Sequence, residues 1–279
     1  MLRYFIFLLF PLLACSSTNQ TERKGFISLH PAITETIFYL KAQDKLIGRS
    51  TYCSNPSEAE KLPVFGTSFT PNLEAIAQKS PKALLADQSI GAQNAALRQI
   101  TTVHELAWLS KDDIESSIAE LGKILQAEDA ANTLVQRFEM EFSIPDTIIA
   151  PPRVLILMLG SDMDKGQLWY IRQDSLHGTA LEVAGFQNAA PKVKTTPSMS
   201  FEELILSNPD IILLVGNESI DKASSEDMIA SLMRFSQIKA VQNEQIARIE
   251  MHNAIGIGPR LLELPTKIIE TIALLPKSK

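Results

Sequence analysis

Several aromatic, histidine and acidic residues stand where predicted strands end, and these are the side chains best placed to bind a ligand. Aromatic rings supply flat apolar contact area, and a few polar groups among them fix a ligand's orientation. Such a mixture suits a large, flat, partly apolar molecule. The alternative for each ring is packing in the core. The candidates are Tyr52, Phe69, Asp87, Trp169, His252 and Asn253, with His30, Cys53 and Tyr170 beside them.

Metal binding and catalysis are the other chemistries to consider. His30 and His252 could meet across a cleft as axial ligands of a metal, with Cys53 as a third candidate, although none of the four histidines lies within helical reach of another. Structural histidines with satisfied hydrogen bonds are the alternative. The sequence lacks Gly-x-Ser-x-Gly, Walker A and His-Glu-x-x-His motifs. Nothing in it points to an enzyme or to a cofactor of its own.

An internal repeat predicts two similar lobes around these residues. The segment 72–87 recurs at 200–215 with a constant offset of 128 residues, and Thr70 and Ser198 are the expected caps. In each copy a short helix ends at a proline and an apolar strand follows, and proline is confined to helix starts and breaks. A second echo, of 29–35 at 176–182, has an offset of 147. The chain is therefore expected to form two α/β units.

The order of elements indicates how the lobes are built and joined. Short apolar strands alternate with helical patterns, which is typical of parallel, doubly wound sheets. From Asp112 to Phe142 an apolar stripe continues at helical spacing after a capping box at Ser110 and Asp113, and a helix of that length would be about 45 Å long. We predict an α/β fold with two doubly wound lobes joined by a single long α-helix.

The predicted boundaries follow from this order. The divisions are 1–24 for a signal and tether, 25–110 for the first lobe, 111–143 for the linking helix and 144–279 for the second lobe. The expected strands include 26–29, 46–50, 83–86, 103–107, 153–159, 168–171 and 246–250, and the expected helices 31–42, 92–99, 177–184 and 258–275, the last divided or kinked at Pro265.

Glu74 and Glu202 occupy the same position in the two copies of the repeat, in the first turn of a helix. A carboxylate there offsets the positive end of the helix dipole by about 0.3–1 kcal/mol, which would explain one of them. Their recurrence at one register favours a pseudo-twofold pair of surface acids instead. Such a pair would fit a symmetric partner with two basic sockets.

The first 24 residues are predicted to be an export signal and tether and not part of the fold. Arg3 precedes the apolar run Tyr4–Leu13, which is too short to span a bilayer. The following Leu12-Leu13-Ala14-Cys15 resembles a bacterial lipobox, which predicts a lipid anchor on Cys15 at the periplasmic or cell-surface face of a membrane. An ordinary secretory signal is the alternative. The mature chain then has one further cysteine and no intramolecular disulfide.

Composition limits the class of partner. The formal net charge is -6 and there is no long basic run, which argues against a nucleic-acid partner because phosphate neutralisation needs clustered lysines and arginines. A hydrophobic content of 45% in 279 residues is enough for one large core or two modest ones, and the repeat favours two.

Five motifs together resemble a known family, the cobalamin-, haem- and siderophore-binding proteins of ABC importers, with the cobalamin-binding branch the most similar. The similarity extends over nearly the whole mature chain and implies two α/β lobes bridged by one long helix. The motifs are Ser-Leu-His-Pro-Ala-Ile-Thr-Glu (28–35), Leu-Ile-Gly-Arg-Ser-Thr-Tyr-Cys (46–53), Pro-Asn-Leu-Glu (71–74), Leu-Glu-Val-Ala-Gly (181–185) and Gly-Pro-Arg (258–260).

The resemblance assigns roles to four of the residues. It implies that Glu74 and Glu202 engage arginines of the two subunits of a permease, which works with an ATPase. It also implies that Tyr52 and Trp169 contact the corrin ring. We therefore expect the ligand to be clamped between Tyr52 with Phe69 on one side and Trp169 on the other, with small movement of the lobes.

The chain also departs from the cobalamin branch. Other positions that are aromatic in that branch are Ser68, Asp87 and Thr196 here, although Phe69 could replace the first. The run 256–260, Gly-Ile-Gly-Pro-Arg, looks more like the haem-binding branch. A corrinoid is the first expected ligand, haem the second and a ferric siderophore the third. The alternative from another class is a non-transport lipoprotein, either an enzyme or a sensor on the same fold.

Overall fold

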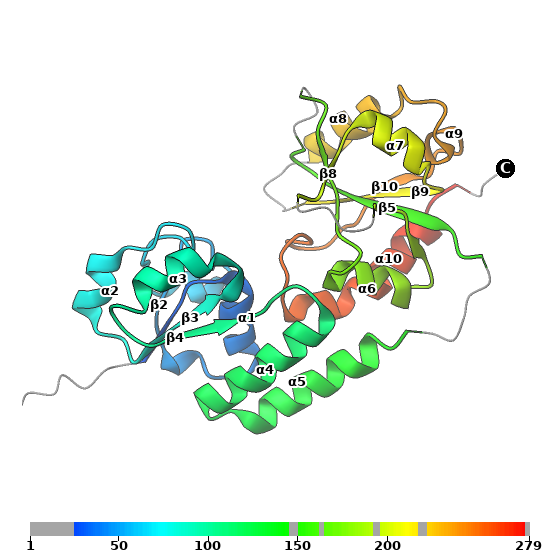
Figure 1. Ribbon diagram of the computed structural model, residues 1–279. Coiled ribbons are helices and arrows are strands. Elements are labelled where there is room, and N and C mark those ends of the chain that lie inside the picture. The colour runs from blue at the N-terminus through cyan, green and yellow to red at the C-terminus, as the bar shows by residue number, and fades with distance from the viewer. Residues whose placement is uncertain (1–24, 145–149, 162–164, 192–195, 217–221, 277–279) are drawn as a thin grey trace, which may run out of the picture.

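The computed structural model describes residues 25–276 except 145–149, 162–164, 192–195 and 217–221 (Figure 1). Two α/β lobes, each built on a four-stranded parallel sheet, are joined by a helical segment. The predicted fold class is thereby confirmed. Cys15 and the predicted tether lie outside the described residues.

The sheet of the first lobe has the strand order β2-β1-β3-β4, and all of its neighbours are parallel. The two central strands are the most buried, as expected when helices cover both faces. Its elements are β1 (Phe26–Ser28), α1 (Pro31–Tyr39), β2 (Leu46–Arg49), α2 (Leu73–Lys79), β3 (Ala83–Asp87), α3 (Gly91–Leu97) and β4 (Val103–Leu106).

The sheet of the second lobe has the order β10-β9-β5-β7, again parallel, and a two-stranded antiparallel ribbon of β6 and β8 stands beside it. The predicted last helix is divided at Pro265, which lies in the first turn of α10. The elements are β5 (Arg153–Met158), β6 (Leu168–Trp169), α6 (Leu176–Val183), β7 (Gln187–Asn188), β8 (Ser198–Met199), α7 (Phe201–Ser207), β9 (Ile211–Val215), α8 (Lys222–Leu232), α9 (Lys239–Gln242), β10 (Ile246–Arg248), the 3-10 helix η5 (Pro259–Glu263) and α10 (Leu264–Ala273).

The repeat at offset 128 is reproduced residue by residue. Helix α2 corresponds to α7 and strand β3 to β9, with both boundaries of each pair shifted by 128. Each helix ends on a residue in the left-handed conformation, Ser80 at φ 48° and Asn208 at φ 40°. A proline follows each of them and prevents the helix from continuing. The matched prolines therefore mark the same helix-to-strand junction in both lobes.

The second echo is less regular. His30 is the N-cap residue of α1, whereas His177 is the second residue of α6, which Ser175 caps. Ser175 Oγ accepts a hydrogen bond from the Gly178 N–H at 3.2 Å. A hydroxyl two residues before His177 therefore starts this helix earlier than its counterpart, so the two histidines point into different surroundings.

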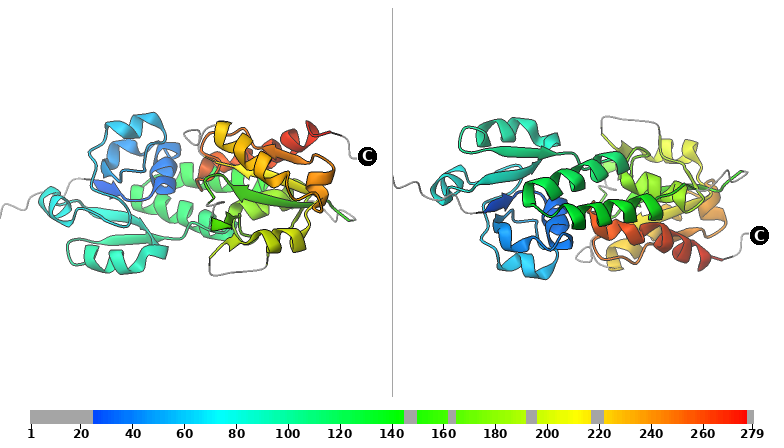
Figure 2. Two further views of the ribbon diagram at one scale, coloured as in Figure 1. Left: turned by 90° about the horizontal axis from the view of Figure 1, so that it is seen from above. Right: turned by 90° about the horizontal axis from the view of Figure 1, so that it is seen from below.

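The predicted single linking helix is wrong in one respect: it is two helices, α4 (Lys111–Leu125) and α5 (Glu128–Glu141), which lie side by side and run in opposite directions (Figures 1 and 2). Gln126 adopts the left-handed conformation at φ 50°, and the Ala127 N–H bonds back to the Gly122 carbonyl at 2.8 Å. A Cβ at Gly122 would lie 2.5 Å from the Cβ of Ala131, so glycine permits the close crossing.

The sequence pattern conceals the break because the apolar stripe continues through it. Ile118 and Leu121 of α4 and Leu134 and Phe138 of α5 are all buried against the same core. The stripe reports which face is buried and does not report a reversal of direction. The acidic pair Glu128 and Asp129 at the start of α5 was the signal of a new helix start.

The predicted capping box at the start of α4 is confirmed and leads to a stability prediction. The Asp113 N–H donates to Ser110 Oγ at 3.1 Å, and the Ser110 N–H donates to Asp113 Oδ2 at 3.0 Å. Ser110→Ala is expected to lower the free energy of unfolding by about 1 kcal/mol. Denaturant unfolding would measure this loss, with Ser116→Ala at an exposed position of the same helix as the control. Equal effects of the two changes would contradict the cap.

The lobes share one hydrophobic core. A continuous cluster of buried side chains includes Phe26 and Ile33 of the first lobe, Ile118 of α4 and Val154 of the second lobe. Two smaller clusters lie within single lobes, one containing Ile27 and the other Leu155. One face of each sheet therefore packs toward the shared core and the other face toward its own lobe.

Candidate ligand-binding site

The carboxyl edge of the first sheet carries one candidate side chain from each strand. In sheet order these are Tyr52 after β2, His30 after β1, Asp87 at the end of β3 and Trp108 after β4. The strands are parallel, so their carboxyl ends meet at one edge, which is where ligands bind in doubly wound sheets. The topology thus collects residues that are far apart in the sequence.

His30 and Asp87 form a pair at the middle of this edge. His30 Nε2 lies 3.4 Å from Asp87 Oδ2, and the His30 ring stacks on Trp108 with a centroid distance of 6.4 Å. Burial lowers the pKa of His30 and the Asp87 carboxylate opposes that shift, with burial the larger effect. The imidazole is therefore neutral at pH 7. Among the described residues neither His30 Nδ1 nor Trp108 Nε1, both buried, has a hydrogen-bond partner.

Tyr52 and Phe69 present large aromatic surfaces to solvent, with 61% and 64% of their areas exposed. The loop that carries Phe69 is held against β1, because the Ser68 hydroxyl donates to the Leu29 carbonyl. Exposed rings of this size at a sheet's carboxyl edge are available for a ligand and do not serve the core. Both residues remain predicted ligand contacts.

Trp108 was not among the contacts predicted from the sequence. It is 4% exposed and packs in the shared core while its ring faces His30. The available signal was its position directly after the predicted strand 103–107, the same rule that selected His30 and Tyr52. At this edge the Trp108 ring stacks against that of His30.

In the second lobe the candidates lie on the antiparallel ribbon and after β10. Trp169 is half-buried in β6, and its backbone N–H donates to Ser161 Oγ at 2.9 Å. Tyr170 is 1% exposed and packs in the core, so it does not line a surface. His252 is exposed after β10, and Asn253 takes the left-handed conformation at φ 46°. Trp169, His252 and Asn253 stay predicted ligand contacts.

Cys53 is fully buried, and its Sγ lies 3.1 Å from Ser50 Oγ. Burial raises the pKa of the thiol, which keeps it protonated and unreactive. This environment argues for a packing role and against an axial metal ligand. Within the described part of the chain, no three His, Cys, Asp or Glu side chains gather so that they could hold a metal ion.

Glu74 and Glu202 are both exposed second residues of their helices. The start of α7 is closed by Ser200 and Glu203, whose carboxylate accepts the Ser200 N–H at 2.9 Å. In α2 the cap is Asn72, whose side chain accepts the Ala75 N–H at 3.0 Å. The caps are therefore Asn72 and Ser200 and not the expected residues two positions earlier. Neither Glu74 nor Glu202 is needed to cap its helix, and both side chains are exposed.

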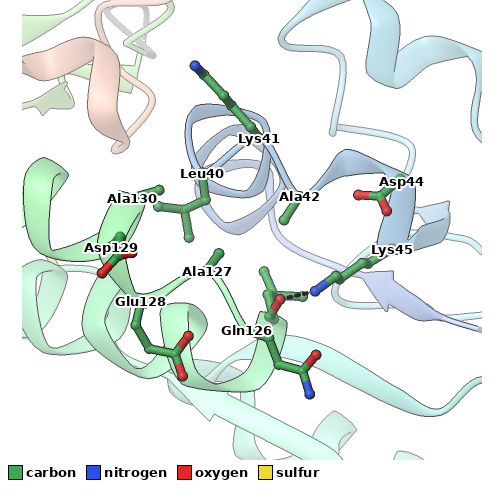
Figure 3. Close-up of a pocket in the computed structure, with 11 residues that line it drawn as sticks. Leu40, Lys41, Ala42, Asp44, Lys45, Gln126, Ala127, Glu128, Asp129 and Ala130 are labelled. Atoms are coloured by element: carbon green, nitrogen blue, oxygen red, sulfur yellow. Dashed lines mark hydrogen bonds between the residues drawn. The ribbon is translucent and has the colours of Figure 1, made fainter.

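A separate cavity of about 490 Å³ lies where the α4–α5 turn meets the first lobe (Figure 3). Its lining comes from residues 40–42, 44 and 45, which follow α1, and from residues 125–130. Lys45 Nζ donates to the Leu125 carbonyl and so satisfies an end group of α4. None of the predicted ligand contacts lines this cavity. It lies where the hairpin formed by α4 and α5 packs against the first lobe.

Two lobes on parallel sheets, with aromatic and polar side chains at their carboxyl edges, define a two-lobed solute-binding protein. The chain belongs to the periplasmic binding protein family, whose sequence profile matches residues 27–251. Proteins of this family bind substrates for transport and are not enzymes.

Individual relatives are described as substrate-binding, vitamin B12-binding or haem-binding proteins. An ABC transporter substrate-binding lipoprotein of Bacillus subtilis is 25% identical over 283 residues, which cover 94% of this chain and 86% of the relative. A vitamin B12-binding protein of Photorhabdus laumondii is 26% identical over 202 residues, covering 69% and 70%. The structure of a periplasmic haem-binding protein of Vibrio cholerae aligns with a TM-score of 0.71 at 21% identity, covering 88% and 98%. These relatives are substrate-binding proteins, in agreement with the family match, and the first of them belongs to an ABC transporter.

Proposed function

We propose that the protein captures a corrinoid between its lobes and delivers it to an ABC permease. The observation that carries this proposal is the pair of exposed rings, Tyr52 and Phe69, at the carboxyl edge of the first sheet. A corrin is flat and partly apolar at its faces and polar at its rim. Rings would stack on the face, while His30 with Asp87 on one side and His252 with Asn253 on the other would meet the polar rim.

Delivery requires contact with the permease dimer, which we assign to Glu74 and Glu202. Both side chains are exposed, and the matching boundaries of α2 and α7 place them at the same register of the two lobes. Hydrogen bonding to Ser200 is the largest cause that lowers the pKa of Glu202, so this group is ionised at neutral pH. Two exposed acids suit two arginine-bearing sockets. The permease would then separate the lobes and release the ligand.

The protein works outside the cytoplasm, as its family and its lipoprotein relative indicate. We assign the membrane anchor to a lipid on Cys15. No helix among the described residues is long and apolar enough to cross a membrane. A lipid anchor would keep the protein near its permease without restricting the lobes.

Titration of the purified protein with cyanocobalamin and with haemin tests the ligand assignment. We expect cyanocobalamin to bind with a Kd below ~10 μM. Tryptophan fluorescence and visible absorbance would measure the binding. Tyr52→Ala should weaken binding about tenfold, which is about 1.4 kcal/mol of lost stacking. Tyr39→Ala, at an exposed tyrosine on α1, is the matched control and should leave the affinity unchanged.

The outcomes separate the alternatives. If haemin binds tightly and cyanocobalamin does not, the assigned ligand becomes haem. The haem-binding structural relative is the observation that supports this alternative. Failure of both ligands below ~10 μM would contradict both assignments and leave a ferric siderophore as the next ligand to titrate. A non-transport lipoprotein, enzyme or sensor, would be favoured if the gene stood apart from permease and ATPase genes.

A further inference from the structure

The segment 254–260, between β10 and α10, is held by one residue from each lobe, and we name it the strap. From the first lobe, Glu35 of α1 accepts the Arg260 N–H at 2.9 Å and the Arg260 Nε–H at 2.7 Å, and a third contact joins Arg260 Nη2 to the same carboxylate. From the second lobe, His177 Nε2 of α6 lies 2.7 Å from the Ala254 carbonyl oxygen. A carbonyl only accepts, so His177 Nε2 carries the proton.

Both contacts are buried. The Glu35 side chain is 0% exposed and that of Arg260 is 10%, while His177 is 2% exposed. Burial lowers the pKa of Arg260 to about 10, so the guanidinium stays charged at neutral pH. Loss of either charge would leave the other buried without its partner, which is strongly destabilising. The pair therefore holds Arg260 in one position against α1.

The backbone of the strap passes directly over the Glu35 carboxylate. A Cβ at Gly258 would lie 3.0 Å from Glu35 Oε2, so a side chain there would crowd the carboxylate. In the next turn, Leu261 and Leu262 of η5 enter the core that both lobes share. The strap is therefore seated on α1 even though it belongs by sequence to the second lobe (Figure 1).

Each of the two contacts uses one member of the second sequence echo. Its members are Leu29-His30 with Glu35 and Leu176-His177 with Glu182. The first lobe uses the glutamate of the echo to hold the strap, and the second lobe uses the histidine. The remaining members, His30 and Glu182, do not hold the strap, since His30 lies at the sheet edge beside Asp87 and Glu182 is exposed.

We propose that Glu35 and His177 act as positioning residues that clamp the strap and thereby fix the two lobes relative to each other. His252 and Asn253 immediately precede the strap, so the same clamp sets where this predicted ligand loop stands against the first lobe. The α4–α5 hairpin, which turns back at Gln126, is the covalent connection between the lobes. The clamped strap is a second connection, made by non-covalent contacts.

The distance between the lobes tests the clamp without any ligand. Spin labels at Gln78→Cys and Leu206→Cys would report it, because both positions are exposed and correspond at offset 128. Cys15→Ser leaves Cys53, which is fully buried, as the remaining natural cysteine. Glu35→Gln and His177→Ala are each expected to broaden the interlobe distance distribution roughly twofold. Glu182→Gln, the matched change at the other glutamate of the echo, should give the unaltered distribution.

A second variant tests the clamp in case Glu35→Gln does not fold. If Glu35→Gln does not fold, Glu35→Ala with Arg260→Ala removes both charges together with the side-chain contact, and the same broadening is expected. An unaltered distribution in these folded variants would overturn the clamp, as would equal broadening in Glu182→Gln.

The part of the proposal that concerns His252 and Asn253 rests on the proposed function. Cyanocobalamin is the probe, and its dissociation should be about tenfold faster from Glu35→Gln than from the unaltered protein. An unaltered dissociation rate would overturn the link to the ligand loop. Failure of the unaltered protein to bind cyanocobalamin would contradict the proposed ligand, while the spin-label distances, measured without ligand, would still decide the clamp.

Discussion

Arg260→Met is expected to lower the free energy of unfolding by about 3–5 kcal/mol, because it leaves a buried charge without its partner. That charge is the Glu35 carboxylate, which is 0% exposed and accepts three hydrogen bonds from Arg260. Methionine cannot neutralise the carboxylate, and of the three donors only the backbone N–H of residue 260 would remain. The carboxylate must then stay charged in a poorly solvated environment or take up a proton.

Chemical denaturation at neutral pH would measure the loss. The matched control is Arg98→Met, because Arg98 also pairs with a carboxylate, that of Glu105, but in an exposed setting. Its loss should be no more than about 1 kcal/mol. The double change of Glu35→Met with Arg260→Met should recover much of the stability, because an apolar pair of similar volume avoids the desolvation cost. Equal losses of unfolding free energy in Arg260→Met and Arg98→Met would contradict a strong contribution of the buried pair to stability.

Replacing Glu74 and Glu202 together by alanine is expected to abolish uptake of the ligand while leaving its affinity for the isolated protein unchanged. Both side chains are exposed on the second residue of a short helix, and neither caps that helix. Their removal therefore costs little stability, and docking onto two basic sockets would lose both of its charged contacts. The single variants should reduce uptake and not eliminate it.

Uptake by cells that carry the permease, together with titration of the purified variants, would measure the two quantities separately. Glu128→Ala with Glu182→Ala is the matched control, since it removes two other exposed helical glutamates that lie outside the repeat at offset 128. Normal uptake by the Glu74 and Glu202 double variant would contradict the docking role. The two acids would then serve only to offset the helix dipole. Loss of ligand affinity in that variant would show that the effect is not confined to docking.

The fold could be predicted from the sequence in considerable detail because its local signals agree. Pro81 and Pro209 fix where α2 and α7 must end, and the structure reproduces these junctions at the constant offset of the repeat. The linking segment shows the opposite case. Its apolar stripe continues through Gln126, and a stripe reports burial and not direction, so the reversal into two helices was not predicted.

The candidate site divides in the same way. The rule that ligands bind beyond the carboxyl ends of parallel strands selected Tyr52, His30 and Asp87 from the sequence. The contact of His30 with Asp87 depends on the strand order β2-β1-β3-β4, which places β1 beside β3, and strand order is a long-range property. Trp108 satisfies the same rule but was not predicted.

The sequence by itself determined two α/β lobes, their matched helix-to-strand junctions and the paired acids Glu74 and Glu202, because each depends on residues close together in the chain. Only the tertiary structure decided that Glu35 and Arg260, which are 225 residues apart, form a buried ion pair across the lobes. The physical reason is that local propensity acts over a few residues, whereas a buried charge finds its partner only when packing brings distant segments together.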